Sequence, residues 1–127
     1  MAKHYLVATA AADISDASGT DQFTMEAPFA GNLRVNECFV RWTEATGTQT
    51  TTQGVLSILV AGTSRATLTA NRSDAIGQTQ AFATTTAGDS TWNFAAGDTI
   101  LVEVLTQAVD GTTVGDGDVY LALEWGV

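Results

Sequence analysis

Cysteine, histidine and proline each occur only once in this 127-residue chain. A single cysteine, Cys38, has no partner for an internal disulfide, so we expect a fold that does not depend on oxidation. A free cysteine is usually a small buried hydrophobic residue, and no Lys or His lies near Cys38 in the sequence to activate its thiol. An intermolecular disulfide and a reactive thiol are the two alternatives that stay open.

Basic residues are also scarce. Five Lys and Arg stand against fourteen Asp and Glu, which gives a formal net charge of −9. A nucleic-acid-binding surface needs clustered cations to neutralise phosphates, and an anionic membrane attracts cations in the same way. We therefore predict neither a nucleic-acid nor a membrane partner. An acidic surface of this kind keeps an exposed protein soluble.

Long hydrophobic runs are missing as well. No segment approaches the ~18 consecutive apolar residues of a membrane span. The first twelve residues contain one Lys, an apolar patch and several small residues, as a signal peptide does. The patch is short, however, and Thr9 interrupts it. We predict a strand here, and we expect synthesis in the cytoplasm without export.

Helix-periodic segments are absent too, whereas Thr, Val and Ile are frequent. These β-branched residues fit a pleated sheet better than a helix. We predict one all-β domain over residues 1–127, an antiparallel, jelly-roll-like β-sandwich of about eight strands. The stretches that we expect to supply strands are 3–10, 23–27, 33–44, 54–61, 64–70, 78–86, 95–107 and 118–127.

Three stretches depart from simple alternation. Residues 33–44 change phase between Val35 and Cys38, which predicts a β-bulge, the alternative being a strand buried on both faces. Residues 11–21 are small, polar and acidic, which predicts a loop or an extended arm. Residues 45–53 are polar and of low complexity, so we expect an exposed, mobile loop.

The stretch from Ala95 to Gln107 has the clearest pattern. A Gly-Asp turn precedes a β-branched run in which Ile100, Val102 and Val104 share one face. The opposite face presents Leu101, Glu103 and Leu105, where an isolated subunit should be polar. Apolar residues on the second face imply that something covers them. These three residues are therefore our candidate subunit interface, with a loop of the same chain as the equal alternative.

Residues that carry chemistry are few. His4 is the only histidine, and one His with one Cys does not make a usual zinc site. Asp110, Asp116 and Asp118 are oxygen donors of the kind that calcium prefers, but Asp and Gly also favour tight turns. The three tryptophans are better explained by core packing than by a sugar platform. We predict no enzyme activity, no cofactor and no metal site.

Four segments together resemble a known group of proteins. They are Phe-Ala-Gly-Asn-Leu-Arg-Val at 29–35, Gly-Val-Leu-Ser-Ile-Leu-Val-Ala-Gly at 54–62, Phe-Ala-Ala-Gly-Asp-Thr-Ile-Leu-Val-Glu-Val at 94–104 and Val-Tyr-Leu-Ala-Leu-Glu-Trp at 119–125. Their order resembles that of the jelly-roll decoration or cement proteins of tailed-bacteriophage heads. The same pattern is similar to C1q-like domains and to the head domains of tail fibres.

The resemblance implies a structural virion protein that binds the major capsid protein on the outside of the head as a dimer or trimer. It implies synthesis in the host bacterial cytoplasm and no catalytic residues. We expect the N-terminal strand and arm, residues 1–21, to contribute an assembly contact. The alternative that the resemblance leaves open is a carbohydrate- or receptor-binding jelly roll of a tail fibre.

Overall fold

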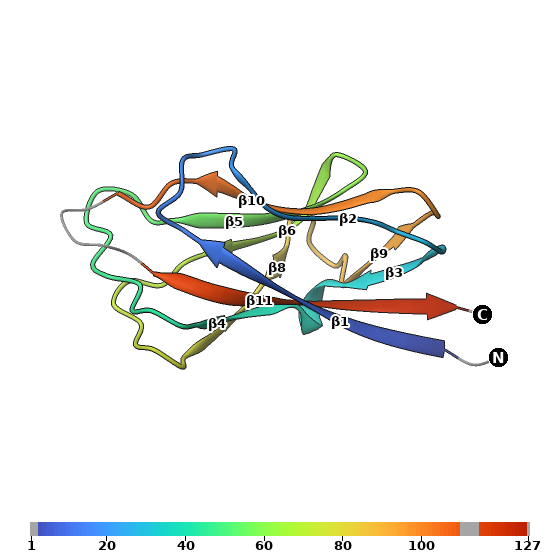
Figure 1. Ribbon diagram of the computed structural model, residues 1–127, viewed down its shortest axis with the longest axis horizontal. Helices are drawn as coiled ribbons and strands as arrows, with labels where there is room; N and C mark the ends of the chain where they lie inside the picture. Colours follow the sequence, from blue (N-terminus) through green and yellow to red (C-terminus); the bar gives the residue numbers. More distant parts are fainter. Residues whose placement is uncertain (1–2, 110–114, 127) are drawn as a thin grey trace.

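Two antiparallel sheets packed against each other make up the protein (Figure 1). The computed structural model describes residues 3–109 and 115–126, and the side chains of residues 11–109 and 115–125. Within these residues, eleven strands confirm the predicted all-β sandwich. The strands are β1 (Lys3–Asp13), β2 (Asp21–Glu26), β3 (Gly31–Arg34), β4 (Phe39–Trp42), β5 (Val55–Val60), β6 (Thr63–Thr69), β7 (Thr79–Ala81), β8 (Ala83–Thr84), β9 (Thr91–Phe94), β10 (Thr99–Thr106) and β11 (Asp116–Gly126).

The strand order is jelly-roll-like. In the first sheet β11 pairs with β1 on one side and with both β3 and β4 on the other, and β9 and β7 follow outside these two. The second sheet has the order β2-β10-β5-β6-β8. The last two strands of the chain therefore lie inside the sheets, β11 in the first and β10 in the second. Each is flanked by strands from much earlier in the sequence, as in a double-sheet Greek-key arrangement.

The predicted bulge in residues 33–44 is wrong. A 3-10 helix, Val35–Glu37, separates β3 from β4 and closes with a hydrogen bond from the Cys38 N–H to the Val35 carbonyl. This tight turn shifts the alternation, because its three residues advance the chain less than a strand would. Leu33 and Val35 before the shift, and Cys38, Val40 and Trp42 around and after it, are all buried.

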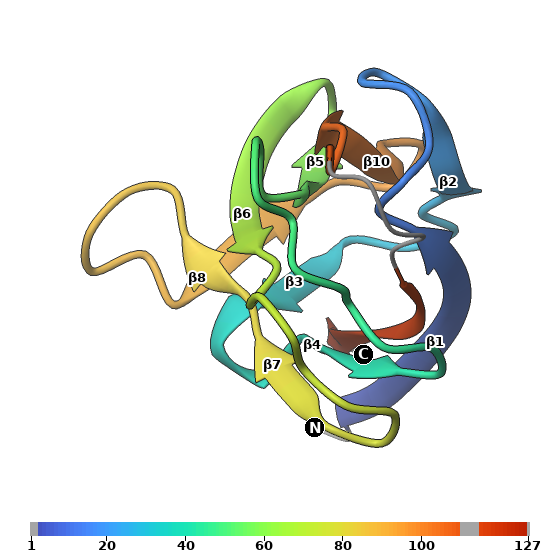
Figure 2. The same ribbon diagram turned by 90° about the vertical axis from the view of Figure 1, so that its left-hand side faces the viewer.

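A second predicted strand, residues 78–86, crosses from one sheet to the other. β7 pairs with β4 in the first sheet, and β8 pairs with β6 in the second. Between them lies Phe82, whose side chain is buried and whose N–H donates to the Cys38 carbonyl. Figure 2 shows this corner, where the two short strands join the sheets at one side of the sandwich.

The core confirms the predicted phase of β10. Ile100, Val102 and Val104 of β10 are fully buried. They face Val119, Leu121 and Leu123 of β11, which are equally buried, across the interior of the sandwich. Side chains of alternate residues therefore fill the space between the sheets, as the pleat requires.

The prediction that residues 45–53 form an exposed loop is wrong in part, because two of its polar residues are buried. Thr46 and Gln49 have no exposed surface. The Gln49 amide oxygen accepts the Gly54 N–H at 2.7 Å, and its nitrogen donates to the Asn71 carbonyl at 2.9 Å. The Thr46 hydroxyl also donates to the Asn71 carbonyl. These side chains satisfy backbone groups that would otherwise be buried without partners, which the composition of the loop did not reveal.

Residues 11–21 also differ from the predicted loop or arm. The first three complete β1, and Ile14 is fully buried. The remainder follows the end of β10, since the Gly19 N–H donates to the Val104 carbonyl and the Gln107 N–H donates to the Ser18 hydroxyl at 2.9 Å. The described part of the chain contains no helix that is long and apolar enough to cross a membrane.

Gly117 provides a test of the packing between β11 and β4. A Cβ atom at this position would lie 2.6 Å from Val40 Cγ2 and 2.9 Å from Trp42 Cε3. We expect Gly117→Ala to lower the free energy of unfolding by about 1–3 kcal/mol through overpacking. Urea denaturation measures the change, with Thr91→Ala at an exposed strand position as the comparison. Equal stability of the two variants would contradict this account.

Candidate interaction surface

The outer face of the second sheet carries the predicted interface residues. β10 lies between β2 and β5, so that Leu101 has Thr24 on one side and Leu59 on the other. Leu101 and Leu59 are both half-buried. They form an apolar pair across neighbouring strands, on the face that points away from the core.

Leu105 extends this apolar surface towards the end of β10. The pairing of β10 with β5 shifts between Val104 and Thr106, which places Leu105 at the irregularity. A bulged residue has no direct partner and its side chain is redirected. The Leu105 side chain is accordingly 47% exposed. It is one of four exposed large hydrophobic residues in the described part of the chain.

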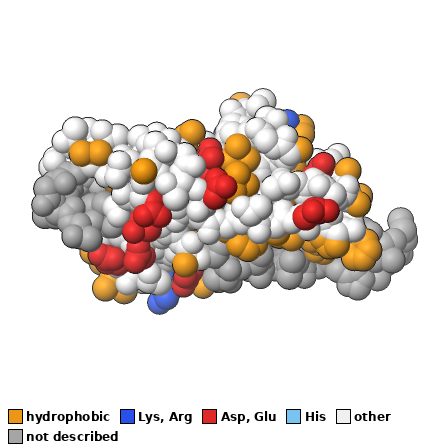
Figure 3. Space-filling model, turned by 45° about the horizontal axis from the view of Figure 1, so that its top comes forward, with side chains coloured by type: hydrophobic (Ala, Val, Ile, Leu, Met, Phe, Trp, Pro, Cys, Tyr) orange, Lys and Arg blue, Asp and Glu red, His pale blue; other side chains and the backbone are white. Residues whose placement is uncertain are grey.

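Glu103 gives the same face an acidic centre. It lies between Asp21 of β2 and Ser57 of β5. Ser57 is buried and shares a 2.7 Å hydrogen bond between hydroxyl groups with Ser64. The accessible part of this face therefore combines leucine side chains, the Thr24 hydroxyl and carboxylates. Figure 3 shows Asp and Glu side chains spread over this side of the molecule, with hydrophobic side chains between them.

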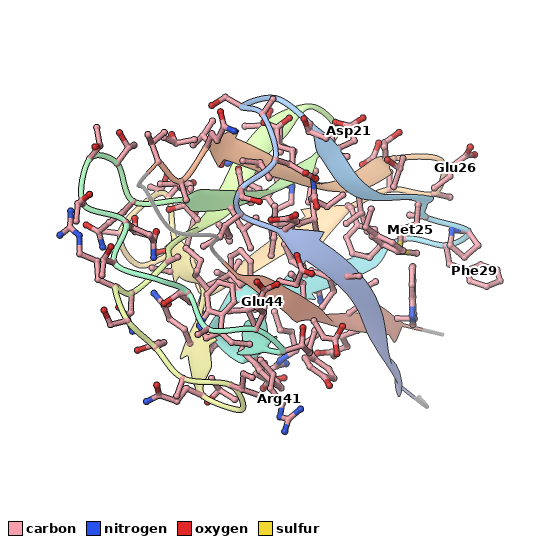
Figure 4. All side chains as sticks on the ribbon, turned by 60° about the vertical axis from the view of Figure 1, so that its left-hand side comes forward. Asp21, Met25, Glu26, Phe29, Arg41 and Glu44 are labelled. Carbon is pink, nitrogen blue, oxygen red and sulfur yellow. The ribbon has the colours of Figure 1, made fainter. Side chains whose placement is uncertain are left out.

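A second apolar surface, which was not predicted from the sequence, lies at one end of the sandwich. Phe29, in the loop between β2 and β3, is 66% exposed and projects from the body beside Met25 and Glu26 (Figure 4). Its ring meets that of Trp125 edge-on, with 6.5 Å between centroids. The sequence feature that could have indicated this surface is the Pro28-Phe29 pair, because an aromatic residue stands in a turn where polar residues are usual.

The loop that carries Phe29 is anchored to the turn before β10. The Ala27 N–H donates to the Asp98 carbonyl at 2.8 Å, and the Gly97 N–H donates to the Ala27 carbonyl at 2.7 Å. Ala27 itself is buried. Phe29 is thus presented by two turns that are hydrogen-bonded to each other. An aromatic side chain held in this way makes contacts at little entropic cost.

An acidic cleft lies at the other end of β11. It has a volume of about 260 Å³ and is lined by Ala11, Ala12, Asp13, Gln22, Thr43, Asp116, Gly117 and Asp118. Burial, followed by the nearby carboxylates of Asp13 and Glu44, raises the pKa of Asp116 above its ordinary value of 3.8. Among the described residues no three His, Cys, Asp or Glu side chains are placed to hold a metal ion. Asp110, the third calcium candidate, lies outside them.

The tryptophans and Cys38 serve the packing of the core. Trp42 is fully buried and Trp125 is 8% exposed, while Trp92 is half-buried beneath the Arg65 guanidinium, 3.0 Å from its ring centroid. Cys38 is buried, and this burial raises the pKa of its thiol to about 11. A thiol of this kind is unreactive, which favours the packing interpretation. The side chain of His4 lies outside the described residues.

No family model, curated protein or solved structure matches this chain.

Asp116 predicts a specific pH dependence. A carboxyl whose pKa is raised on folding binds protons more readily in the folded state, so stability falls as pH rises from 3.8 through the raised value. Asp116→Asn removes this repulsion. We expect a higher Tm at pH 7 and a smaller change in Tm between pH 7 and pH 4. Asp89→Asn, at an exposed turn, is the control; identical shifts in both variants would argue against the cluster.

Proposed function

We propose that this chain is a structural subunit that decorates the outside of a bacteriophage head. In this role it binds the major capsid protein and stabilises the shell as part of a homo-oligomer. It has no catalytic function, is made in the bacterial cytoplasm and ends in the virion. The proposal combines the resemblance of the four sequence segments with the character of the exposed surfaces.

The observation that carries the proposal is the apolar surface formed by Leu59, Leu101 and Leu105. A sheet face that carries leucines outward gains free energy when another surface covers it. Leu105 is held there by the irregular pairing at the end of β10. We infer that this face packs on a neighbouring subunit of the decorated shell.

The charge of the chain supports a position on the exterior. A net charge of −9 disfavours contact with packaged DNA, because like charges repel and no cation cluster is available to neutralise phosphates. On the outer face of the second sheet, Asp21 and Glu103 lie beside the apolar residues. A partner surface that combines apolar side chains with Lys or Arg would complement this arrangement.

Head binding tests the proposal. Heads of the encoding phage that lack this chain are mixed with the purified protein and sedimented through a sucrose cushion. We expect the wild type to co-sediment at a saturable ratio. Leu105→Glu should weaken binding at least tenfold, because a charge would be buried against the neighbouring subunit. Absence of the wild-type protein from the pellet would refute the proposal.

A matched control is available at Ile76. Its side chain is 67% exposed, and it belongs to the loop before β7, on the opposite side of the molecule from β10 (Figure 2). Ile76→Glu introduces the same charge into an exposed apolar position and should leave binding unchanged. Point variants are preferable to removing the N-terminal residues, because β1 pairs with β11 over its whole length.

A carbohydrate-binding module is the second candidate, and Phe29 is the observation that favours it. An exposed aromatic ring offers a face on which a sugar ring can stack. Trp125 lies against Phe29, so an occupied site should change the tryptophan fluorescence. We expect a saturable change on titration with the recognised glycan, and its loss in Phe29→Ala. Flat titrations across a panel of bacterial surface glycans would exclude this candidate.

A further inference from the structure

The sheet edges of this protein differ greatly in length. In the described part of the chain, the edge strands besides β1 are β2, β7, β8 and β9, which contain six, three, two and four residues. Short edge strands are a common protection against unwanted pairing. β1 is the exception, because it contains eleven residues and has a single neighbour in its sheet, β11.

The sequence of β1 also lacks the usual protection. Between Lys3 and Asp13 it reads His-Tyr-Leu-Val-Ala-Thr-Ala-Ala-Ala, without a carboxylate, a lysine, an arginine or a proline. Edge strands that stay unpaired usually carry such residues. The pairing of β1 with β11 runs without a register shift from Lys3 to Asp13, so no bulge turns the edge away.

The direction of the free backbone groups follows from one hydrogen bond. The Asp13 N–H donates to the Gln22 side-chain oxygen at 2.9 Å, on the side away from β11. In an antiparallel ladder the backbone groups of alternate residues point to the same side. Tyr5, Val7, Thr9 and Ala11 therefore also direct their N–H and carbonyl groups towards the outer edge. Ala11 is exposed at that edge.

We propose that β1 pairs along this outer edge with β1 of a second copy of the chain, in antiparallel orientation. The first sheets of the two subunits then form one continuous sheet across a two-fold axis. With the axis at Ala8, Tyr5 lies opposite Ala11 and Val7 opposite Thr9. These are the residues with outward backbone groups, so each pair exchanges two hydrogen bonds.

Charge complementarity points to a second copy as the occupant. In the same register Lys3 of one copy lies opposite Asp13 of the other, at both ends of the paired strands. β1 carries its positive end residue and its negative end residue at equal distances from Ala8. An antiparallel second copy therefore places opposite charges at both ends of the paired strands. The inference does not depend on the proposed role in a phage head.

The mass of the purified chain in solution is the first test. Light scattering should give about twice the 13.2 kDa of the single chain. Val7→Pro removes one outward N–H but no hydrogen bond to β11, since proline is tolerated at an edge. We expect this variant to have the mass of one chain with an unchanged far-ultraviolet spectrum. Val7→Thr retains the N–H and should remain a dimer.

Cross-linking tests the register independently. Tyr5→Cys and Ala11→Cys chains are prepared separately, and Cys38 stays buried in both. A mixture of the two should form a disulfide-linked dimer on mild oxidation, because opposite residues of a hydrogen-bonded pair lie about 5.5 Å apart. Each variant alone should not, since its two cysteines would be about 20 Å apart along the strands.

Three results would overturn the inference. The first is a mass of one chain for the wild type together with no cross-link in the mixture. The second is a dimer that persists in Val7→Pro, which would assign the interface to another surface. The third is cross-linking of either cysteine variant alone with none in the mixture, which would exclude this register.

Discussion

β11 is the strand on which the first sheet depends. It is paired with β1 along one side and with both β3 and β4 along the other, while its inward side chains fill the core. Gly117 and Gly31 allow this, because a Cβ atom at either would lie within 3 Å of the opposing strand. The final segment of the chain therefore joins strands from the beginning and the middle, and the sheet forms only when these distant contacts are made together.

An ion pair between a half-buried arginine and a buried carboxylate lies beside this strand. Glu124 alternates with the core residues of β11 and therefore points away from the core, yet it is only 4% exposed. The Arg34 Nη1 atom lies 2.7 Å from its carboxylate and the Arg34 Nε atom 3.2 Å from that of Glu37. The hydrogen bond to Glu124, with the charge of Glu37, raises the pKa of the guanidinium. Removing Arg34 would take one hydrogen bond and one opposite charge from the buried Glu124 carboxylate, and such a loss is destabilising.

Three exposed surfaces stand out in the described part of this protein. The outer face at Leu101 and Leu105, the projecting Phe29 and the edge of β1 are three separate surfaces, on a sheet face, at a sandwich end and along a strand. An apolar face gains from being covered, an exposed aromatic from entering a pocket, and a free edge from pairing. These contacts differ in geometry, and a subunit that uses two of them has neighbours in two directions.

The sequence determined the class of fold and the inward face of β10, because alternation with period two records burial on one face of a strand. It also identified Leu101, Glu103 and Leu105 as the outward set. Only the tertiary structure revealed the 3-10 turn after Arg34, the crossing at Phe82 and the burial of Gln49. The last two depend on hydrogen bonds to residues distant in sequence, namely those of Gln49 to Asn71 and of Phe82 to Cys38. Local pattern carries no information about such partners. The same holds for the edge strands of the sheets. The alternation within a strand can be recognised in the sequence, but the number of strands that pair with it is known only from the tertiary structure.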